Sequence, residues 1–257
     1  MQKLSMIIKY DGSRYFGWQR QSQLISVQEV LEKTLSKTLQ QVITIDGSGR
    51  TDAGVHALGQ CISFSAALNI PVDKLKFVLN SRLPSDIYVE SVNIENESFH
   101  ARYDAIGKTY IYKVYTGHDR DPFVDKYSFH YPQPLDIESI REAMRYFLGT
   151  HDFRTYMAAG SKTQNTIRTI HAFLLEDQPD FLVFTITGDG FLYNMVRIII
   201  GSLLHVGAGK ISASEIPKII NSGCRDLAKF TVPANGLYLK AVYYSQKSLE
   251  ESLSKND

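Results

Sequence analysis

The spacing of apolar residues predicts several helices. Val27, Leu31, Leu35 and Leu39 recur at helical spacing, and Ser26 with Glu29 has the form of a capping box, which predicts a helix that begins after Ser26. By the same pattern and by their capping residues, we predict further helices over residues 74–79, from Asp136 to Gly149, from Met195 to Gly207, and after a cap at Ser214.

Short runs rich in β-branched and aromatic residues predict strands between these helices. In the run Thr109–Tyr115, the side chains of Tyr110, Tyr112 and Val114 fall on one face. A turn-forming segment separates two further runs and predicts a hairpin. The predicted strands cover residues 4–10, 42–45, 60–65, 87–94, 109–115, 169–175, 181–187 and 237–244.

Strands and helices are mixed without the regular alternation of a parallel sheet, which indicates an α+β protein with two related mixed halves around antiparallel sheets. The polar segment 95–98 separates the halves, because a new strand begins at Tyr110. We predict an N-terminal half over residues 1–100, a C-terminal half over 101–245, and a solvated tail over 246–257.

Composition places the chain among globular proteins. It has 257 residues, of which 44% are hydrophobic and 21% charged, so disordered and fibrous classes are excluded. The apolar stretch 195–206 is too short and too polar for a membrane span, and the amino end lacks the features of a signal peptide. Two cysteines cannot form a disulfide framework or a cysteine-based zinc site. We therefore expect a soluble protein of the cytoplasm with no membrane partner.

The charge balance adds one local feature. The net charge of +1 argues mildly against a polyanionic partner. However, residues 153–175 contain Arg154, Lys162 and Arg168 and no acidic residue, so this segment could contact phosphates. A solvated connector explains the same composition equally well.

The most unusual stretch runs from Gly47 to His56, where three glycines flank Arg50 and Asp52. Its spacing fits neither a P-loop nor a dinucleotide site. In an extended segment the two charged side chains lie on one side, so Arg50 would favour an ionised Asp52, as a nucleophile or general base requires. From the loop alone, a tight turn closed by a structural ion pair is favoured over this chemistry by about two to one.

Other chemistries have weaker support. No two of the seven histidines have the spacing of a zinc-binding helix, and Cys61, in an apolar strand, is expected to be an inert core thiol. The segment Tyr15–Arg20 combines rings, amides and cations in a composition suited to stacking on bases. Half-buried packing is the alternative for these aromatic residues and for the strand tyrosines.

The stretch Gly47–Ala57, with Gly59 and Gln60, resembles the signature of the tRNA pseudouridine synthase A family. The other motifs that match in order are Tyr10-Asp11-Gly12 with Phe16-Gly17-Trp18-Gln19, Phe99-His100-Ala101-Arg102, Lys108–Tyr112, Gly149–Phe153, Gly188–Arg197 and Pro233–Leu237. The resemblance extends over nearly the whole chain as far as Tyr244.

The resemblance implies an enzyme that isomerises uridine to pseudouridine at positions 38, 39 and 40 of the tRNA anticodon stem-loop. It also implies a homodimer, a reaction without cofactor or metal, and an extended, mainly antiparallel sheet flanked by helices. By position, Asp52 corresponds to the nucleophile, Tyr110 to the tyrosine that stacks on the target uracil, and Arg50 and Arg197 to arginines of the active-site cleft.

Two other functions remain as alternatives. A tRNA-binding folding chaperone would use the same basic and aromatic residues but would give Asp52 no role. A small-molecule hydrolase with Asp52 as nucleophile would not need the Tyr15–Arg20 segment. If the partner is tRNA, folding and dimerisation must gather positive charge, for which the sequence offers Arg14, Arg20, Lys162 and Arg168.

Overall fold

The computed structural model describes residues 1–161, 163–228 and 230–254, so the predicted RNA contact Lys162 lies outside the described residues. The chain divides into two compact units. The first unit comprises Met1–Ile106 and Tyr238–Tyr244; the second comprises Gly107–Leu237 with the residues that follow Tyr244. The predicted α+β class with mainly antiparallel strands is confirmed in both units.

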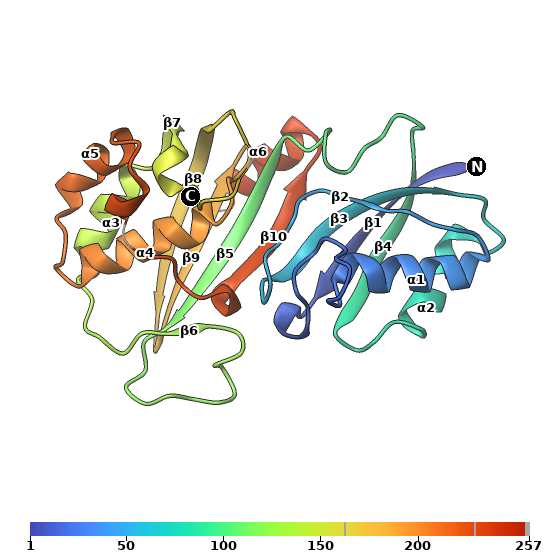
Figure 1. The fold of residues 1–257 in the computed structure, drawn as a ribbon, viewed down its shortest axis with the longest axis horizontal. Helices are drawn as coiled ribbons and strands as arrows, with labels where there is room; N and C mark the ends of the chain where they lie inside the picture. Colours follow the sequence, from blue (N-terminus) through green and yellow to red (C-terminus); the bar gives the residue numbers. More distant parts are fainter. Residues whose placement is uncertain (162, 229, 255–257) are drawn as a thin grey trace. The chain divides into compact units, whose positions relative to one another are not determined.

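The first unit is built on the sheet β4-β1-β3-β10, with the short strand β2 also paired to β3 (Figure 1). β1 (Gln2–Tyr10) lies antiparallel between β3 (His56–Ala66) and β4 (Ile87–Glu95). β10 (Leu237–Tyr243) pairs with β3 in parallel, with Tyr238 opposite His56. β3 is buried along nearly its whole length, in contrast to the half-buried alternation predicted for residues 60–65.

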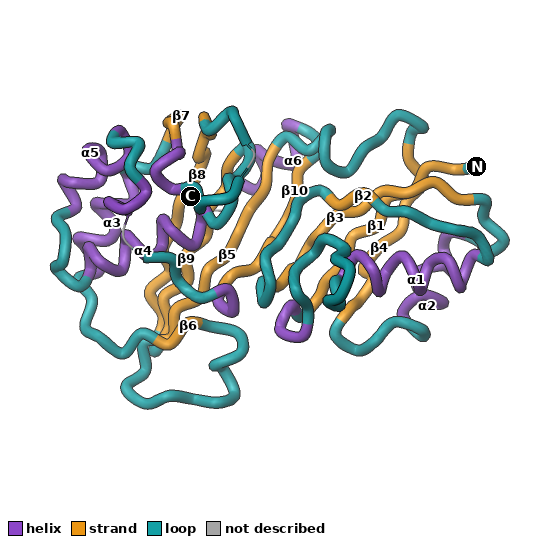
Figure 2. Tube along the Cα trace, in the orientation of Figure 1, coloured by secondary structure: helices purple, strands orange, loops and turns teal. Residues whose placement is uncertain are grey.

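Two helices, α1 (Val27–Leu39) and α2 (Val72–Asn80), lie beside this sheet in the first unit (Figure 1). The predicted start of α1 is confirmed, because the Ser26 hydroxyl accepts a hydrogen bond from the Glu29 N–H. The strand predicted over residues 42–45 is wrong: this segment follows α1 as an irregular loop, and the strand β2 is formed by Asp46–Gly47 (Figure 2). Two backbone N–H groups of this loop bond instead to side chains of α1: that of Ile43 donates to the Ser36 hydroxyl, and that of Ile45 donates to the Glu32 carboxylate.

The second unit contains the antiparallel sheet β5-β9-β8-β7. Its strands are β5 (Gly107–Tyr115), β9 (Phe181–Gly188), β8 (Ile167–Gln178) and β7 (Gly149–Asp152), and β6 (Phe129–His130) pairs with β5 in parallel. The predicted hairpin corresponds to β8 and β9. The three residues predicted to share one face of β5, Tyr110, Tyr112 and Val114, are all buried.

The helices α3 (Ile137–Arg145), α4 (Met195–Gly207) and α5 (Ile216–Asn221) lie together in the second unit (Figure 1). Asp136 caps α3 as predicted, but α3 ends at Arg145, before Gly149. The predicted cap at Ser214 is wrong. Ser212 forms a capping box with Glu215 around a short 3-10 turn (Ala213–Glu215), which leads directly into α5.

The end of the chain differs from the predicted solvated tail. Residues Gln246–Ser254 form helix α6, in which Leu249 is only 4% exposed. The division of the chain also differs from the predicted one after residue 100: the first unit continues to Ile106, and Tyr238–Tyr244 return to it. The pairing of β10 with β3 causes this return, and it joins segments about 180 residues apart that local patterns do not relate. Among the described residues, no helix has both the length and the apolarity needed to cross a bilayer.

Candidate active site

Asp52 lies in a tight turn between β2 and β3 of the first unit. The Val55 N–H donates to the Asp52 carbonyl at 3.1 Å, and Gly54, the third residue of this turn, has a φ of +78°. A residue with a side chain adopts this φ only at a cost, so glycine suits the position. The Asp52 side chain is half-buried, whereas Arg50 is exposed. The turn therefore presents a carboxylate from a defined backbone conformation.

The amino-terminal side of the turn is fixed to β3. The Ser48 N–H donates to the Cys61 carbonyl at 2.8 Å, and the Ser48 hydroxyl donates to Gln60 Oε1 at 2.7 Å. Gln60 Nε2 then donates to the Gly49 carbonyl at 2.8 Å. Ser48 and Gln60 are both fully buried, so these bonds are shielded from competition by water. They hold the chain leading to Arg50 against the sheet.

Thr51, next to Asp52, is held by the segment that follows β1. The Trp18 N–H donates to the Thr51 carbonyl at 3.0 Å, and the Tyr10 and Thr51 hydroxyls are 2.8 Å apart. The Trp18 ring is 3% exposed and packs near Tyr10, with ring centroids 6.2 Å apart. Trp18 is therefore buried beside the Asp52 turn, in agreement with the packing alternative for the aromatic residues of the Tyr15–Arg20 segment.

Two glycines allow these segments to approach so closely. A Cβ added to Gly12 would lie 2.0 Å from the Val55 carbonyl oxygen, and one added to Gly17 would lie 2.7 Å from the Thr51 carbonyl oxygen. The Gly12 N–H also donates to His56 Nδ1 at 3.0 Å. The buried His56 ring stacks on Tyr238, with centroids 4.7 Å apart. No such role was predicted for His56, Tyr10 or Trp18; the glycines at positions 12 and 17 are the sequence feature that indicates this close approach.

In the second unit, Tyr110 and Arg197 occupy well-defined positions. Tyr110 pairs with Ile186 across β5 and β9, is 8% exposed, and meets Phe191 edge to face at 5.2 Å between centroids. Arg197, in the first turns of α4, donates from Nε to the Val232 carbonyl at 2.8 Å and from Nη1 to Asn194 Oδ1 at 2.7 Å. Its guanidinium plane is thus fixed by two partners on different segments.

Burial and charge also act on groups near these residues. Burial raises the pKa of Tyr112, and the positive charge of Arg197 partly opposes this rise. The Tyr112 hydroxyl donates to the Pro233 carbonyl at 2.8 Å. In the first unit, burial raises the pKa of Cys61 to about 11, which agrees with the predicted inert thiol.

The predicted RNA-contacting arginines have partners within the protein. Arg14 lies 3.2 Å from Asp86, whose other carboxylate oxygen accepts from the Tyr15 hydroxyl. Arg20 forms an ion pair with Glu32. Arg168 donates to the Asn165 carbonyl at 3.1 Å. Within the part of the chain that the structure describes, no group of three or more histidine, cysteine or acidic side chains could hold a metal ion.

Known proteins resemble this chain closely. The family model described as tRNA pseudouridine synthase matches residues 6–104 and 143–245. The tRNA pseudouridine synthase A of Acetivibrio thermocellus is 44% identical over 95% of this chain and 100% of that protein. The enzyme of the same description from Streptococcus equi subsp. equi is 45% identical over 96% and 100%. A solved Cbf5–Nop10–Gar1 complex gives a TM-score of only 0.36 at 12% identity, over 92% of this chain and 47% of that one, a likeness too weak to define the fold.

Proposed function

The chain belongs to the tRNA pseudouridine synthase A family and is a tRNA pseudouridine synthase of the anticodon stem-loop, and we propose that it modifies positions 38, 39 and 40 with Asp52 as its nucleophile. The observation that carries this proposal is the Asp52 turn. The turn combines a half-buried carboxylate with neighbours that are bonded to two different strands. A preorganised carboxylate is what covalent catalysis on a nucleotide requires.

The reaction is an isomerisation. The N1–C1′ bond of uridine breaks, the detached uracil rotates, and a new bond forms between C5 and C1′. C5 loses a proton and N1 gains one, so atoms and electrons balance within the nucleotide. Asp52 can attack C1′, attack C6 of the uracil, or act through a glycal that forms by loss of a proton from C2′. All three routes place an ionised carboxylate beside the nucleotide.

Arg50 and Asp52 are two residues apart, and we assign Arg50 the role of keeping the Asp52 carboxylate ionised. Arg197 is assigned to the substrate through its match to the family motif. Its guanidinium already bonds Val232 and Asn194, so it loses little side-chain entropy when a ligand binds. Exclusion of water from the occupied site would keep the detached uracil in place.

Tyr110 is assigned the contact with the target base. A uridine in a stem must leave the stack before its C1′ can be reached, at a cost of about a few kcal/mol. Stacking of the base on an aromatic ring returns about 1–3 kcal/mol of this cost. The edge-to-face contact with Phe191 supports this role, because it holds the Tyr110 ring in one orientation.

The substrate is tRNA, and its anticodon arm is the proposed binding partner. Arg14, Arg20, Lys162 and Arg168 remain proposed phosphate contacts, and we expect binding to weaken as salt concentration rises. The family resemblance further supports a homodimer that acts in the cytoplasm. Sedimentation of the purified protein tests the homodimer separately.

The proposed activity is tested by incubating the protein with tRNA whose uracils carry tritium at C5. Formation of pseudouridine displaces the C5 hydrogen. We therefore expect the release of one tritium for each labelled uridine that is modified. Mapping of the product should show pseudouridine only in the anticodon arm. Binding of tRNA without tritium release would indicate a chaperone, and release of free uracil would indicate a hydrolase; either result contradicts the proposal.

A further inference from the structure

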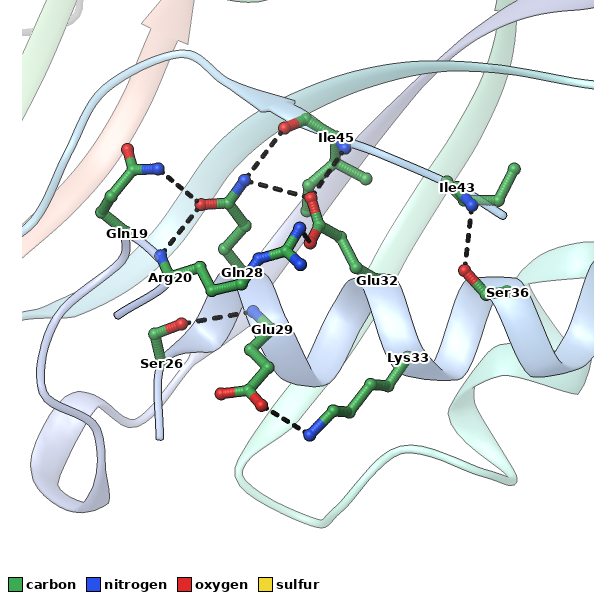
Figure 3. Close-up of polar contacts among 10 residues, drawn as sticks. All are labelled: Gln19, Arg20, Ser26, Gln28, Glu29, Glu32, Lys33, Ser36, Ile43 and Ile45. Carbon is green, nitrogen blue, oxygen red and sulfur yellow. Dashed lines mark hydrogen bonds and ion pairs between the residues drawn. The ribbon is translucent and has the colours of Figure 1, made fainter. Parts of the chain in front are cut away.

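A buried polar cluster lies on α1, on the side of the helix that faces the loops leading to Asp52 (Figure 3). Gln28 uses all four of its hydrogen-bonding positions. Its Oε1 accepts from Gln19 Nε2 and from the Arg20 N–H, each at 3.0 Å. Its Nε2 donates to Glu32 Oε1 at 3.1 Å and to the Ile45 carbonyl at 3.3 Å.

Glu32 completes the cluster. Its Oε1 also accepts from the Ile45 N–H at 3.1 Å, and its Oε2 is paired with the Arg20 guanidinium. The Glu32 side chain is only 6% exposed, whereas that of Arg20 is 55% exposed. A carboxylate at this depth is costly unless charged and hydrogen-bonding partners compensate it, and here Arg20 supplies the opposite charge.

The two segments held by this cluster both lead to the Asp52 turn. Ile45 directly precedes β2, and the chain then passes through Ser48 and Gly49, which β3 holds. Arg20 lies two residues beyond Trp18, whose N–H donates to the Thr51 carbonyl. The start of α1 also fixes this second segment, because the Gln28 N–H donates to the Trp18 carbonyl at 3.1 Å. One carboxylate thus ties together the chain that leads into the turn and the separate segment that bonds Thr51.

We infer that Glu32 is a positioning residue for the reaction. It sets the placement of Asp52 because it holds Ile45 and Arg20 in fixed positions. This inference rests on the proposed function of Asp52. Glu32 itself is assigned no contact with tRNA. Its effect reaches Asp52 through hydrogen bonds and through a few covalently linked residues on either side.

The variant Glu32→Gln tests this inference, because it keeps the shape of the side chain and removes its charge. One amide oxygen cannot serve Ile45, Gln28 and Arg20 together, and the amide NH2 would face the donors of the guanidinium. We expect kcat to fall between about tenfold and a hundredfold, the scale of a small misplacement of a catalytic group. We expect KM for tRNA to stay within about threefold, since substrate binding is retained.

Glu29→Gln is the matched control. Glu29 lies on the same helix, and its side chain pairs with Lys33 at the surface (Figure 3). This variant should match the wild type in kcat and KM. Rates are compared at a temperature well below the thermal unfolding midpoint of each variant, so that a loss of stability alone does not lower kcat.

Arg20→Lys provides a second variant in case Glu32→Gln does not fold. It keeps the charge opposite Glu32 but loses the planar fork, and we expect kcat to fall by about three- to tenfold. A wild-type kcat in either folded variant overturns the inference. If the wild type itself makes no pseudouridine, the proposed function fails instead, and the two failures are therefore distinguishable.

Discussion

Gly17 shows how single residues shape the candidate site. Its φ is +87°, and an added Cβ would lie 2.7 Å from the Thr51 carbonyl, next to Asp52. A methyl group at this point must displace either the Trp18 segment or the Thr51 backbone. The geometry of the Asp52 turn therefore depends on the absence of a side chain on a separate segment, more than thirty positions earlier in the sequence.

The variant Gly17→Ala should lose both stability and activity. The positive φ alone costs about 1–3 kcal/mol of unfolding free energy, and the clash with Thr51 adds to this cost. Because Thr51 adjoins Asp52, kcat should also fall. Urea unfolding and tritium release measure the two effects.

Gly209→Ala separates backbone strain from the clash. Gly209 has a φ of +67°, but nothing lies within 4 Å of its added Cβ. It should therefore lose stability while kcat stays at the wild-type level. Equal kcat values for the two variants would show that contact between Gly17 and Thr51 does not affect the Asp52 turn.

At the scale of elements, α6 is the clearest departure from the local pattern. Leu249 is 4% exposed, and its side chain would lie 3.2 Å from a Cβ added to Gly107 at the start of β5. One apolar residue anchors a helix whose other positions are mostly polar. The sequence of α6 therefore looks like a solvated tail, although Leu249 packs against the fold.

We expect Leu249→Ala to lower the free energy of unfolding by about 2–4 kcal/mol, because it removes a buried side chain and leaves a cavity. Glu250 is the next residue of the helix and its side chain is exposed. Glu250→Ala should therefore change the free energy of unfolding by less than about 0.5 kcal/mol. Urea unfolding of both variants checks this. A similar small change in both would mean that α6 contributes no packing energy.

Elements with local signals were predictable from the sequence. The Ser26 cap and the apolar spacing define α1, and the alternation in Thr109–Tyr115 defines β5 and its buried face. Elements that depend on a distant partner were not. The loop 42–45 looks like a strand by composition, but the N–H groups of Ile43 and Ile45 bond to Ser36 and Glu32 of α1. Ser212 was missed because it caps a 3-10 turn (Ala213–Glu215) that precedes α5, and not the α-helix itself.

The candidate site was predictable only in part for the same reason. The glycines around Asp52 indicate a turn, and the family motif assigns the chemistry. The supports at Tyr10, Trp18 and Gln60 come from other strands and segments, and the sequence gives their types without their contacts. The ion pair between Arg20 and the buried Glu32 was likewise not predicted, since Arg20 looks like a free surface cation.

For the molecule as a whole, the net charge is a poor measure of how its charged groups are arranged. The total is +1, yet Arg14 and Arg20 each pair with an acid of the same unit. Such pairs offset part of the positive charge around these exposed arginines without changing the total. The salt dependence of binding is therefore a better measure of the tRNA-binding surface than the composition.

Buried proton-bearing groups should make the fold sensitive to alkaline pH. Burial raises the pKa of Cys61 to about 11, and it raises the pKa of several tyrosines above their ordinary value of 10.0. These tyrosines are Tyr15, Tyr112, Tyr156 and Tyr244. Above about pH 9 the unfolded chain loses these protons first, while the folded chain keeps them, so unfolding becomes more favourable.

The free energy of unfolding should therefore be fully retained at pH 8 and should fall as the pH rises from 9 to 11. Cys61 alone contributes a loss of up to about 2–3 kcal/mol over this range, at 1.4 kcal/mol per pKa unit. Urea titrations at pH 8, 9 and 10.5 measure the change. A constant free energy of unfolding across these values would contradict the assigned burial.

Tritium release by Asp52→Asn, from tRNA labelled at C5 of uracil, tests directly whether Asp52 is the nucleophile. The amide keeps the shape of the side chain but is a poor nucleophile, so we predict no release above background. The dissociation constant for tRNA should stay within about twofold of the wild-type value, because phosphate contacts dominate affinity. Asp73→Asn, an exposed carboxylate on α2, should release tritium at the wild-type rate. Appreciable turnover by Asp52→Asn would show that the Asp52 carboxylate is not the nucleophile of the isomerisation.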